Sequence, residues 1–134
     1  MSQENVEIVR RGTEAWNRGD VDGFLEVVHP DLEAIPVIAG LAEGTETVYR
    51  GISGARRFWE DWRVEWDFQF GETEFRDLGD TVFALTHISL TGHASGLELD
   101  APMAVIYRFE DGRVVRIQSY LDIAEALEAA GLSE

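Results

Sequence analysis

The chain contains no cysteine and no lysine, and all eleven of its basic residues are arginine. Without cysteine, the protein has no disulfide, no thiolate nucleophile and no zinc–thiolate site. Without lysine, Schiff-base chemistry and a lysine general base are excluded. These absences remove several common kinds of functional site from consideration.

The chain also has no long apolar run and no net positive charge. No apolar run approaches the roughly 20 residues of a membrane-spanning helix, and residues 1–11 lack the apolar core of a signal peptide. We therefore expect a cytoplasmic protein. The formal charge of −15 argues against nucleic acid and against anionic membranes as partners, because both bind basic surfaces.

The 134 residues, 45% of them hydrophobic, suffice for a single ordered domain over residues 1–134. Helices are predicted from Ser2 to Gly19, from an Asp20 cap to Pro30, and from Ser53 to Trp62. A short strand is expected at 33–38, and the polar loop 40–46 is expected to form a lid. The apolar residues at helical spacing, which we expect to be buried, are Ile8, Val9, Gly12, Trp16, Val21, Phe24, Leu25, Val28, Ile52, Ala55, Phe58, Trp59 and Trp62.

From Val64 onward the apolar period changes to two, which is typical of strands. The phase slips at Gly71, and a slip at glycine predicts a β-bulge that bends the sheet. Residues 81–91 are apolar on both faces, so we expect a central strand with helices on one side and a partner subunit on the other. Residues 103–132 predict a strand, a tight turn, a strand and a helix that begins at Asp122. The expected fold is an α+β cone with a curved antiparallel sheet packed on N-terminal helices, a cavity in its concave face, and a homodimer through its outer face.

Five short segments carry a resemblance to a known family. In chain order they are Ala15-Trp16-Asn17-Arg18-Gly19-Asp20, His29-Pro30-Asp31, Tyr49-Arg50-Gly51-Ile52, Asp111-Gly112-Arg113-Val114-Val115 and Tyr120-Leu121-Asp122. Their order and spacing resemble SnoaL-like proteins, the polyketide-cyclase branch of the nuclear transport factor 2-like superfamily. The resemblance implies the cone-shaped, cystatin-like fold and a small-molecule pocket. The superfamily includes isomerases, cyclases, epoxide hydrolases, dehydratases and non-catalytic binding domains, so the fold does not name an activity.

Two enzyme types of the superfamily match poorly. The positions that correspond to the oxyanion donors and the proton-moving aspartate of ketosteroid isomerase hold Gly12, Ile35 and Val105, none of which can exchange a proton. The epoxide hydrolases need an arginine between two aspartates, and neither Arg108 nor Arg116 has such a pair in the sequence. Neither mechanism is expected here.

The polyketide cyclases match better. Like them, the chain has an aspartate, Asp122, that begins the last helix nine residues before Gly131, and the turn around His93 resembles their histidine turn. Where the longer cyclases keep a tryptophan shortly before the aspartate, this chain has Tyr120.

Asp122 and His87 are the predicted catalytic residues. A carboxylate at an aromatic-walled cavity mouth suits proton transfer to or from carbon, but Asp122 and Glu125 also form a capping box, so Asp122 can serve as a helix cap alone. His87 shares the parity of Phe83 and Leu85, which we expect to face the cavity. An imidazole there could act as acid or base, or it could be a hydrogen-bonded core histidine.

A flat, largely apolar ligand is predicted, with no cofactor. The side chains expected to bind it are Trp16, Tyr49, Trp59, Phe83, Met103 and Tyr107, although aromatic residues at helical spacing, Trp59 above all, are also typical of a core. The histidines are too dispersed for a metal site of three ligands. Two hypotheses follow: a cofactor-independent cyclase or isomerase acting on a small carbonyl compound, and a non-catalytic ligand-binding or dimerisation module.

Overall fold

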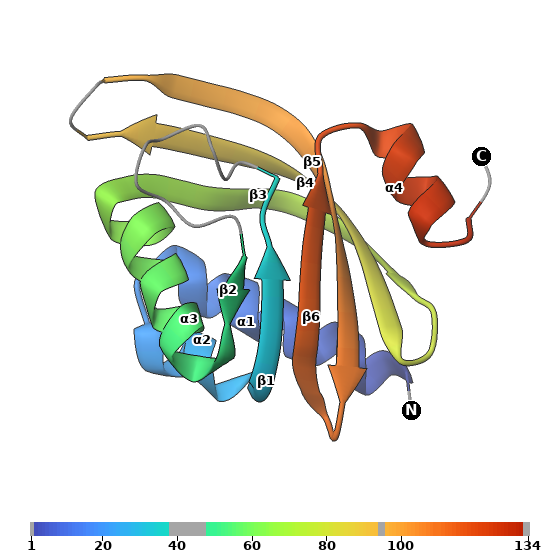
Figure 1. Ribbon diagram of the computed structural model, residues 1–134. Coiled ribbons are helices and arrows are strands. Elements are labelled where there is room, and N and C mark those ends of the chain that lie inside the picture. Colours follow the sequence, from blue (N-terminus) through green and yellow to red (C-terminus); the bar gives the residue numbers. More distant parts are fainter. Residues whose placement is uncertain (1, 38–47, 94–95, 133–134) are drawn as a thin grey trace.

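The computed structural model describes residues 2–37, 48–93 and 96–132 (Figure 1). Its elements follow the predicted order of helices, sheet and C-terminal helix. They are α1 (Ser2–Arg18), α2 (Val21–Glu26), β1 (Val28–Ile35), β2 (Tyr49–Arg50), α3 (Gly51–Trp59), the π-helix η1 (Glu60–Glu65), β3 (Trp66–Asp77), β4 (Thr81–Gly92), β5 (Glu98–Glu110), β6 (Arg113–Tyr120) and α4 (Ile123–Ala129). No helix in these described ranges is long and apolar enough to cross a membrane. The cytoplasmic location stays a prediction.

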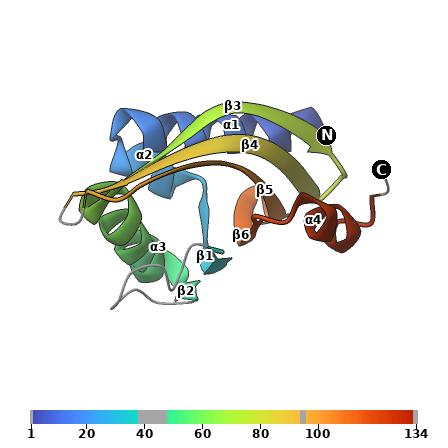
Figure 2. The same cartoon turned by 90° about the horizontal axis from the view of Figure 1, so that it is seen from above.

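The strands form one six-stranded sheet in the order β2-β1-β6-β5-β4-β3. It is antiparallel except where β1 and β6 run parallel, a pairing that the expected antiparallel sheet did not include. Figure 2 shows how strongly it curves. The register shift between Phe70 and Thr73 confirms the bulge at Gly71. A Cβ at Gly71 would lie 2.8 Å from the carbonyl oxygen of His87, so close packing of the two strands requires glycine there.

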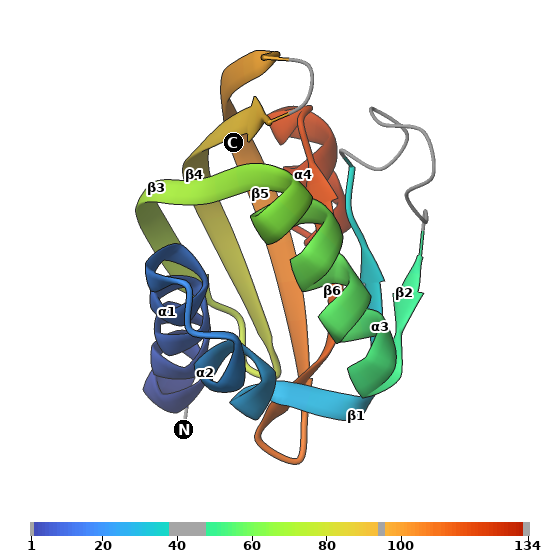
Figure 3. The same cartoon turned by 90° about the vertical axis from the view of Figure 1, so that its left-hand side faces the viewer.

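Helices α1, α2 and α3 lie together on the concave side of the sheet, as Figure 3 shows, and α4 packs elsewhere, against β5 and β6. The main core fills the space between the three helices and the sheet. A second, smaller cluster joins Phe83 and Ala104 to Ala126 of α4. The apolar outer face of β4 at Phe83 and Leu85 is therefore covered by α4 of the same chain, where a partner subunit was expected.

Local capping signals placed the starts of α2 and α4 correctly, whereas α3, expected from Ser53, begins at Gly51 without a side-chain cap. The N–H of Gly23 donates to Asp20 at 3.0 Å, which confirms the Asp20 cap of α2. That hydrogen bond, followed by the nearby Arg18 guanidinium, lowers the pKa of the Asp20 carboxyl. The N–H of Glu125 donates to the Asp122 carboxylate at 3.2 Å, which confirms the cap of α4.

Several predicted boundaries and burials were wrong. Helix α2 ends at Glu26, and Pro30 lies inside β1, because the β-branched residues before it already join the sheet. Ile52, expected to be buried, is 37% exposed. The strand pattern expected from Val64 begins at Trp66, and Val64 lies in the π-helix, 54% exposed. The expected lid at 40–46 and the side chain of Ser2 lie outside the described residues.

Side chains of α1 cover the free edge of β3. The indole N–H of Trp16 donates to the carbonyl oxygen of Phe68 at 2.7 Å. Asn17 both donates to the carbonyl oxygen of Phe70 at 2.7 Å and accepts from its N–H at 2.9 Å. Arg63 of the π-helix donates to the carbonyl oxygens that end α1, at 2.7 and 3.0 Å. These bonds satisfy an edge strand that would otherwise present unpaired backbone groups, and they hold the helix layer against the sheet.

Candidate functional site

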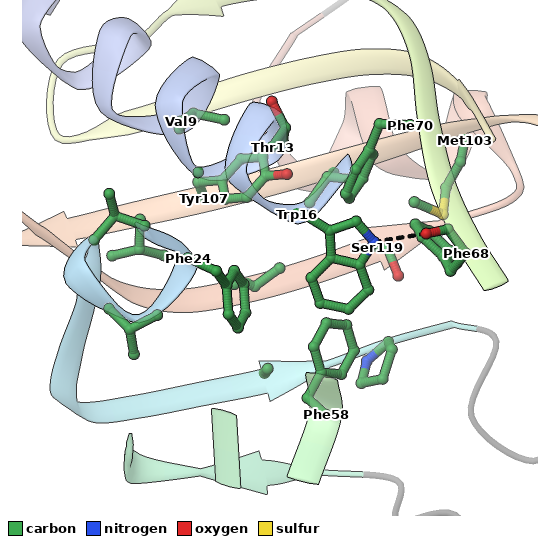
Figure 4. Close-up of a pocket in the computed structure, with 18 residues that line it drawn as sticks. Val9, Thr13, Trp16, Phe24, Phe58, Phe68, Phe70, Met103, Tyr107 and Ser119 are labelled. Atoms are coloured by element: carbon green, nitrogen blue, oxygen red, sulfur yellow. Dashed lines mark hydrogen bonds between the residues drawn. The ribbon is translucent and has the colours of Figure 1, made fainter. Parts of the chain in front are cut away.

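A cavity of about 70 Å³ lies between the three N-terminal helices and the concave face of the sheet (Figure 4). One water needs roughly 10–15 Å³ on this measure, so the space suits several waters or one compact ligand of about ring size. Helices α1 to α3 and strands β1, β3, β5 and β6 all contribute to its wall. The aromatic side chains around it are Trp16, Phe24, Phe58, Phe68, Phe70 and Tyr107.

Three hydroxyl groups, on Thr13, Tyr107 and Ser119, interrupt the apolar wall. Thr13 donates its hydrogen to the carbonyl oxygen of Arg10 at 3.0 Å. Ser119 Oγ accepts from the N–H of Val37 at 2.7 Å and keeps its own hydrogen to donate. The Tyr107 hydroxyl has no hydrogen-bond partner in the described part of the chain, although the residue is only 7% exposed. Burial raises the pKa of Tyr107, so it stays a neutral donor at physiological pH.

The wall carries no formal charge: among the described residues that line the cavity there is no carboxylate, imidazole or guanidinium. An ion transferred into such a space loses its hydration and gains no counter-charge. The cavity therefore suits a neutral and mainly apolar molecule.

Three of the side chains predicted to bind ligand, Trp16, Met103 and Tyr107, line the cavity. Phe83 does not, because it belongs to the cluster under α4 on the opposite face of the sheet. The expected parity for β4 was therefore wrong. Strand β4 turns Val82 and Ile88 toward the main core instead.

The other two predicted ligand-binding residues, Tyr49 and Trp59, belong to the supporting core. The Tyr49 hydroxyl donates to the carboxylate of Asp61 at 2.6 Å and accepts from the indole N–H of Trp62 at 3.2 Å. Trp59 packs edge-on against Trp16, with the ring centroids 5.1 Å apart. Both residues hold the cavity wall in place from behind.

Sequence reasoning did not assign several wall residues to the pocket. Phe68 and Phe70 alternate on β3 and were expected in the sheet, and that alternation was the signal that could have placed them in the wall. Thr13 carried no comparable signal, because isolated hydroxyl residues are common on helices.

Asp122 lies outside the cavity. It is exposed and lines a shallow groove at the end of β6, together with Ile35, Val37, Gln118, Ser119, Tyr120, Leu121 and Glu125. Ser119 borders both the groove and the cavity. Asp122 as a cap is thus observed, and its catalytic role stays a prediction.

His87 also lies outside the cavity, contrary to the expectation that it faces the ligand. Its side chain is 58% exposed on the outer face, and its Nε2 atom contacts the carboxylate of Asp100. The reason is again the parity of β4, whose inward residues are those of the main core. The structure therefore does not bring His87 and the cavity together.

His29 is drawn into a cluster that the sequence did not indicate. Its Nε2 atom lies 3.9 Å from Glu110 and 3.8 Å from Asp111, both in the β5–β6 turn. Its Nδ1 atom accepts from the N–H of Asp31 at 2.9 Å, so the neutral ring carries its hydrogen on Nε2. Nε2 then has no lone pair to offer a metal ion. We interpret the cluster as a structural polar contact that holds β1 against the β5–β6 turn.

The comparison with ketosteroid isomerase agrees with this geometry. Gly12 and Val105 line the cavity, where a proton-exchanging residue would be needed, and neither can supply one. Arg116, considered for an epoxide-hydrolase site, instead pairs with Glu33, which also binds Arg50 at 2.7 Å. None of the three residues of this network, Glu33, Arg50 and Arg116, lines the cavity.

Solved structures with the same fold cover almost the whole chain. A nuclear transport factor 2-like protein of unknown function from Burkholderia pseudomallei is 23% identical, with a TM-score of 0.77 over 93% of this chain and 95% of its own. TerC, co-crystallised with polyporic acid, is 20% identical, with a TM-score of 0.77 over 93% and 96%. A candidate polyketide cyclase from Xanthomonas campestris pv. campestris is 20% identical, with a TM-score of 0.74 over 95% and 96%.

None of the curated proteins matches this chain in sequence. At these identities the solved structures establish the fold, which is the predicted nuclear transport factor 2-like cone. The model of the SnoaL-like domain matches residues 9–117, which include most of α1, all of α2 and α3, and most of the sheet. The chain therefore belongs to the SnoaL-like family.

Proposed function

We propose that the protein binds a small, uncharged and mainly apolar molecule in the cavity. The observation that carries this proposal is the wall itself, which combines aromatic and aliphatic side chains with three neutral hydroxyl groups. Sites of this composition gain affinity from apolar burial and use a few polar groups to orient the ligand. TerC, which shares the fold, was co-crystallised with polyporic acid, and this supports a small-molecule ligand for the present chain.

Thermal shift with a panel of compact neutral aromatic compounds tests the proposal, because a ligand that binds the folded state raises the melting temperature. Val105→Phe is the matched variant, since Val105 lies in the wall and a larger side chain there fills the cavity. We expect shifts in the wild type that the variant loses. Ile117→Phe replaces it if Val105→Phe does not fold. An absence of shifts across the panel, or equal shifts in a folded variant, contradicts binding in this cavity.

A second candidate function is proton-transfer catalysis of the cyclase or isomerase type, in which Asp122 acts at the groove. It is favoured by the position of Ser119, which borders both the cavity and the groove. The candidate polyketide cyclases with the same fold point in the same direction. Binding without catalysis is the first proposal, because no carboxylate or imidazole among the described residues lines the cavity.

Mass analysis of ligand recovered after incubation separates the two functions. A binding protein returns the compound unchanged, whereas a cyclase or isomerase alters its structure. If turnover is found, Asp122→Asn should abolish it while keeping the helix cap, since asparagine caps as well as aspartate. His87→Ala is the comparison. Turnover that persists in both variants contradicts the catalytic assignment.

We also propose a homodimer through the outer face of the sheet. On that face, Glu33 bridges Arg50 of β2 and Arg116 of β6, which places a polar cluster of both charges on the β2–β1–β6 side of the sheet. A second copy of this chain could pair with such a surface by complementary ion pairs.

A further inference from the structure

The Tyr107 hydroxyl is the most informative polar group in the molecule. Its side chain comes from β5, where Tyr107 faces Ile117 of β6, and the residue is 7% exposed. In the described part of the chain its hydroxyl meets no hydrogen-bond partner, although it belongs to the cavity wall (Figure 4). Among the described residues, no buried side-chain nitrogen or oxygen lacks a hydrogen-bond partner, so the unpaired Tyr107 hydroxyl must keep some accessible surface. Because Tyr107 lines the cavity, a partner that enters the cavity can reach this hydroxyl.

Two of the three neighbouring donors are already committed to backbone carbonyl oxygens and cannot bind a ligand. The Trp16 N–H is committed to the Phe68 carbonyl, which is the bond drawn as a dashed line in Figure 4. The Thr13 hydrogen is committed to the Arg10 carbonyl. Ser119 keeps a hydrogen to donate, but its oxygen is held at the mouth by the Val37 N–H. Inside the cavity, Tyr107 is therefore the principal donor.

The same wall discriminates by charge. A carboxylate ligand would have to leave water for a site whose described residues offer neutral donors and no cation. A carbonyl oxygen needs one donor only, and Tyr107 supplies it without any neighbouring charge.

We propose that the ligand is an uncharged carbonyl compound of about ring size, whose oxygen accepts the hydrogen bond of Tyr107 while its apolar body packs against the aromatic wall. This inference rests on the proposed function, since it names the chemical class that the cavity takes. It assigns Tyr107 as the residue that determines specificity for that class.

Three probes of nearly equal size test it: acetophenone, α-methylstyrene and benzoate. The first two differ in one group, because a methylene replaces the carbonyl oxygen, and benzoate adds a negative charge. Dissociation constants follow from isothermal titration calorimetry of each probe against the protein. We expect acetophenone to bind about tenfold more tightly than α-methylstyrene, as one hydrogen bond to a neutral donor predicts. We expect no binding of benzoate at neutral pH.

Tyr107→Phe should remove the preference for acetophenone and leave the affinity for α-methylstyrene unchanged. Tyr120→Phe makes the same chemical change at a tyrosine that packs against the α4 cluster, and it should keep the preference. Equal affinities of the two neutral probes in the wild type, a preference that survives Tyr107→Phe, or tight benzoate binding overturns the inference and leaves the cavity as an apolar site. If none of the three probes binds, the proposed function itself fails for ligands of this size.

Discussion

Replacement of Asn17 by alanine is the most direct test of how the helix layer supports the cavity. The Asn17 side chain makes two hydrogen bonds with the backbone of Phe70, at 2.7 and 2.9 Å, across the free edge of β3. Phe70 also lines the cavity, as does Phe68 two residues earlier. The Asn17→Ala variant therefore disturbs both the stability of the fold and the position of the wall.

The expected cost follows from the two lost bonds. Each hydrogen bond in a folded protein contributes about 1 kcal/mol net, and the loss is larger when a buried partner is left unpaired. The Phe70 backbone is partly buried, so water can reach it in part, and we expect a loss of about 2 kcal/mol in the free energy of unfolding. For a domain of this size that corresponds to a decrease of roughly 4–8 °C in the melting temperature.

Urea denaturation followed by tryptophan fluorescence measures the effect, and Asn5→Ala is the matched control. The Asn5 side chain donates one exposed hydrogen bond to the carbonyl oxygen of Gly79 at 3.0 Å, so its loss should cost less than about 0.5 kcal/mol. Equal small effects in both variants would refute the assignment of Asn17 as the support of the β3 edge. With the support removed, the affinity for a cavity ligand should also fall, whereas Asn5→Ala should leave it unchanged.

The remaining predictions concern Tyr107, Asp122 and the assembly. Because burial raises the folded-state pKa of Tyr107 above its ordinary value of 10.0, the unfolded chain loses that proton first. The contribution of Tyr107 to stability is complete below about pH 10 and decreases above it by up to about 1.4 kcal/mol per pH unit. Urea midpoints measured at pH 8 and at pH 11 should show this decrease in the wild type. The decrease should be smaller in Tyr107→Phe. Asp122→Ala should lower stability by about 1 kcal/mol through loss of the α4 cap, and Asp122→Asn should not. Equal losses in both variants, measured by denaturation, would show that the charge matters more than the cap. Sedimentation at micromolar concentration should give twice the 15.0 kDa of one chain, and a monomeric mass contradicts the proposed dimer.

Local signals in the sequence predicted much of the fold. Asp20 and Asp122 begin helices because a side-chain oxygen beside free N–H groups is favoured whatever the distant contacts are. The β5–β6 turn forms because Asp111 and Gly112 accept the positive φ angles of 54° and 75° that a tight hairpin requires. The bulge at Gly71 has a similar local origin. The order of these signals also carried the family resemblance.

The pocket depended on contacts between distant segments. Strand β4 is apolar on both faces, so its sequence alone left open which face meets the cavity, and the packing of α4 against Phe83 decided it. That decision placed His87 on the outer face with Asp100. Likewise, nothing near Tyr107 in the sequence distinguishes its hydroxyl from a paired one. The hydroxyl has no partner because α1, β5 and β6 meet around the cavity, and none of these elements places an acceptor or donor next to it.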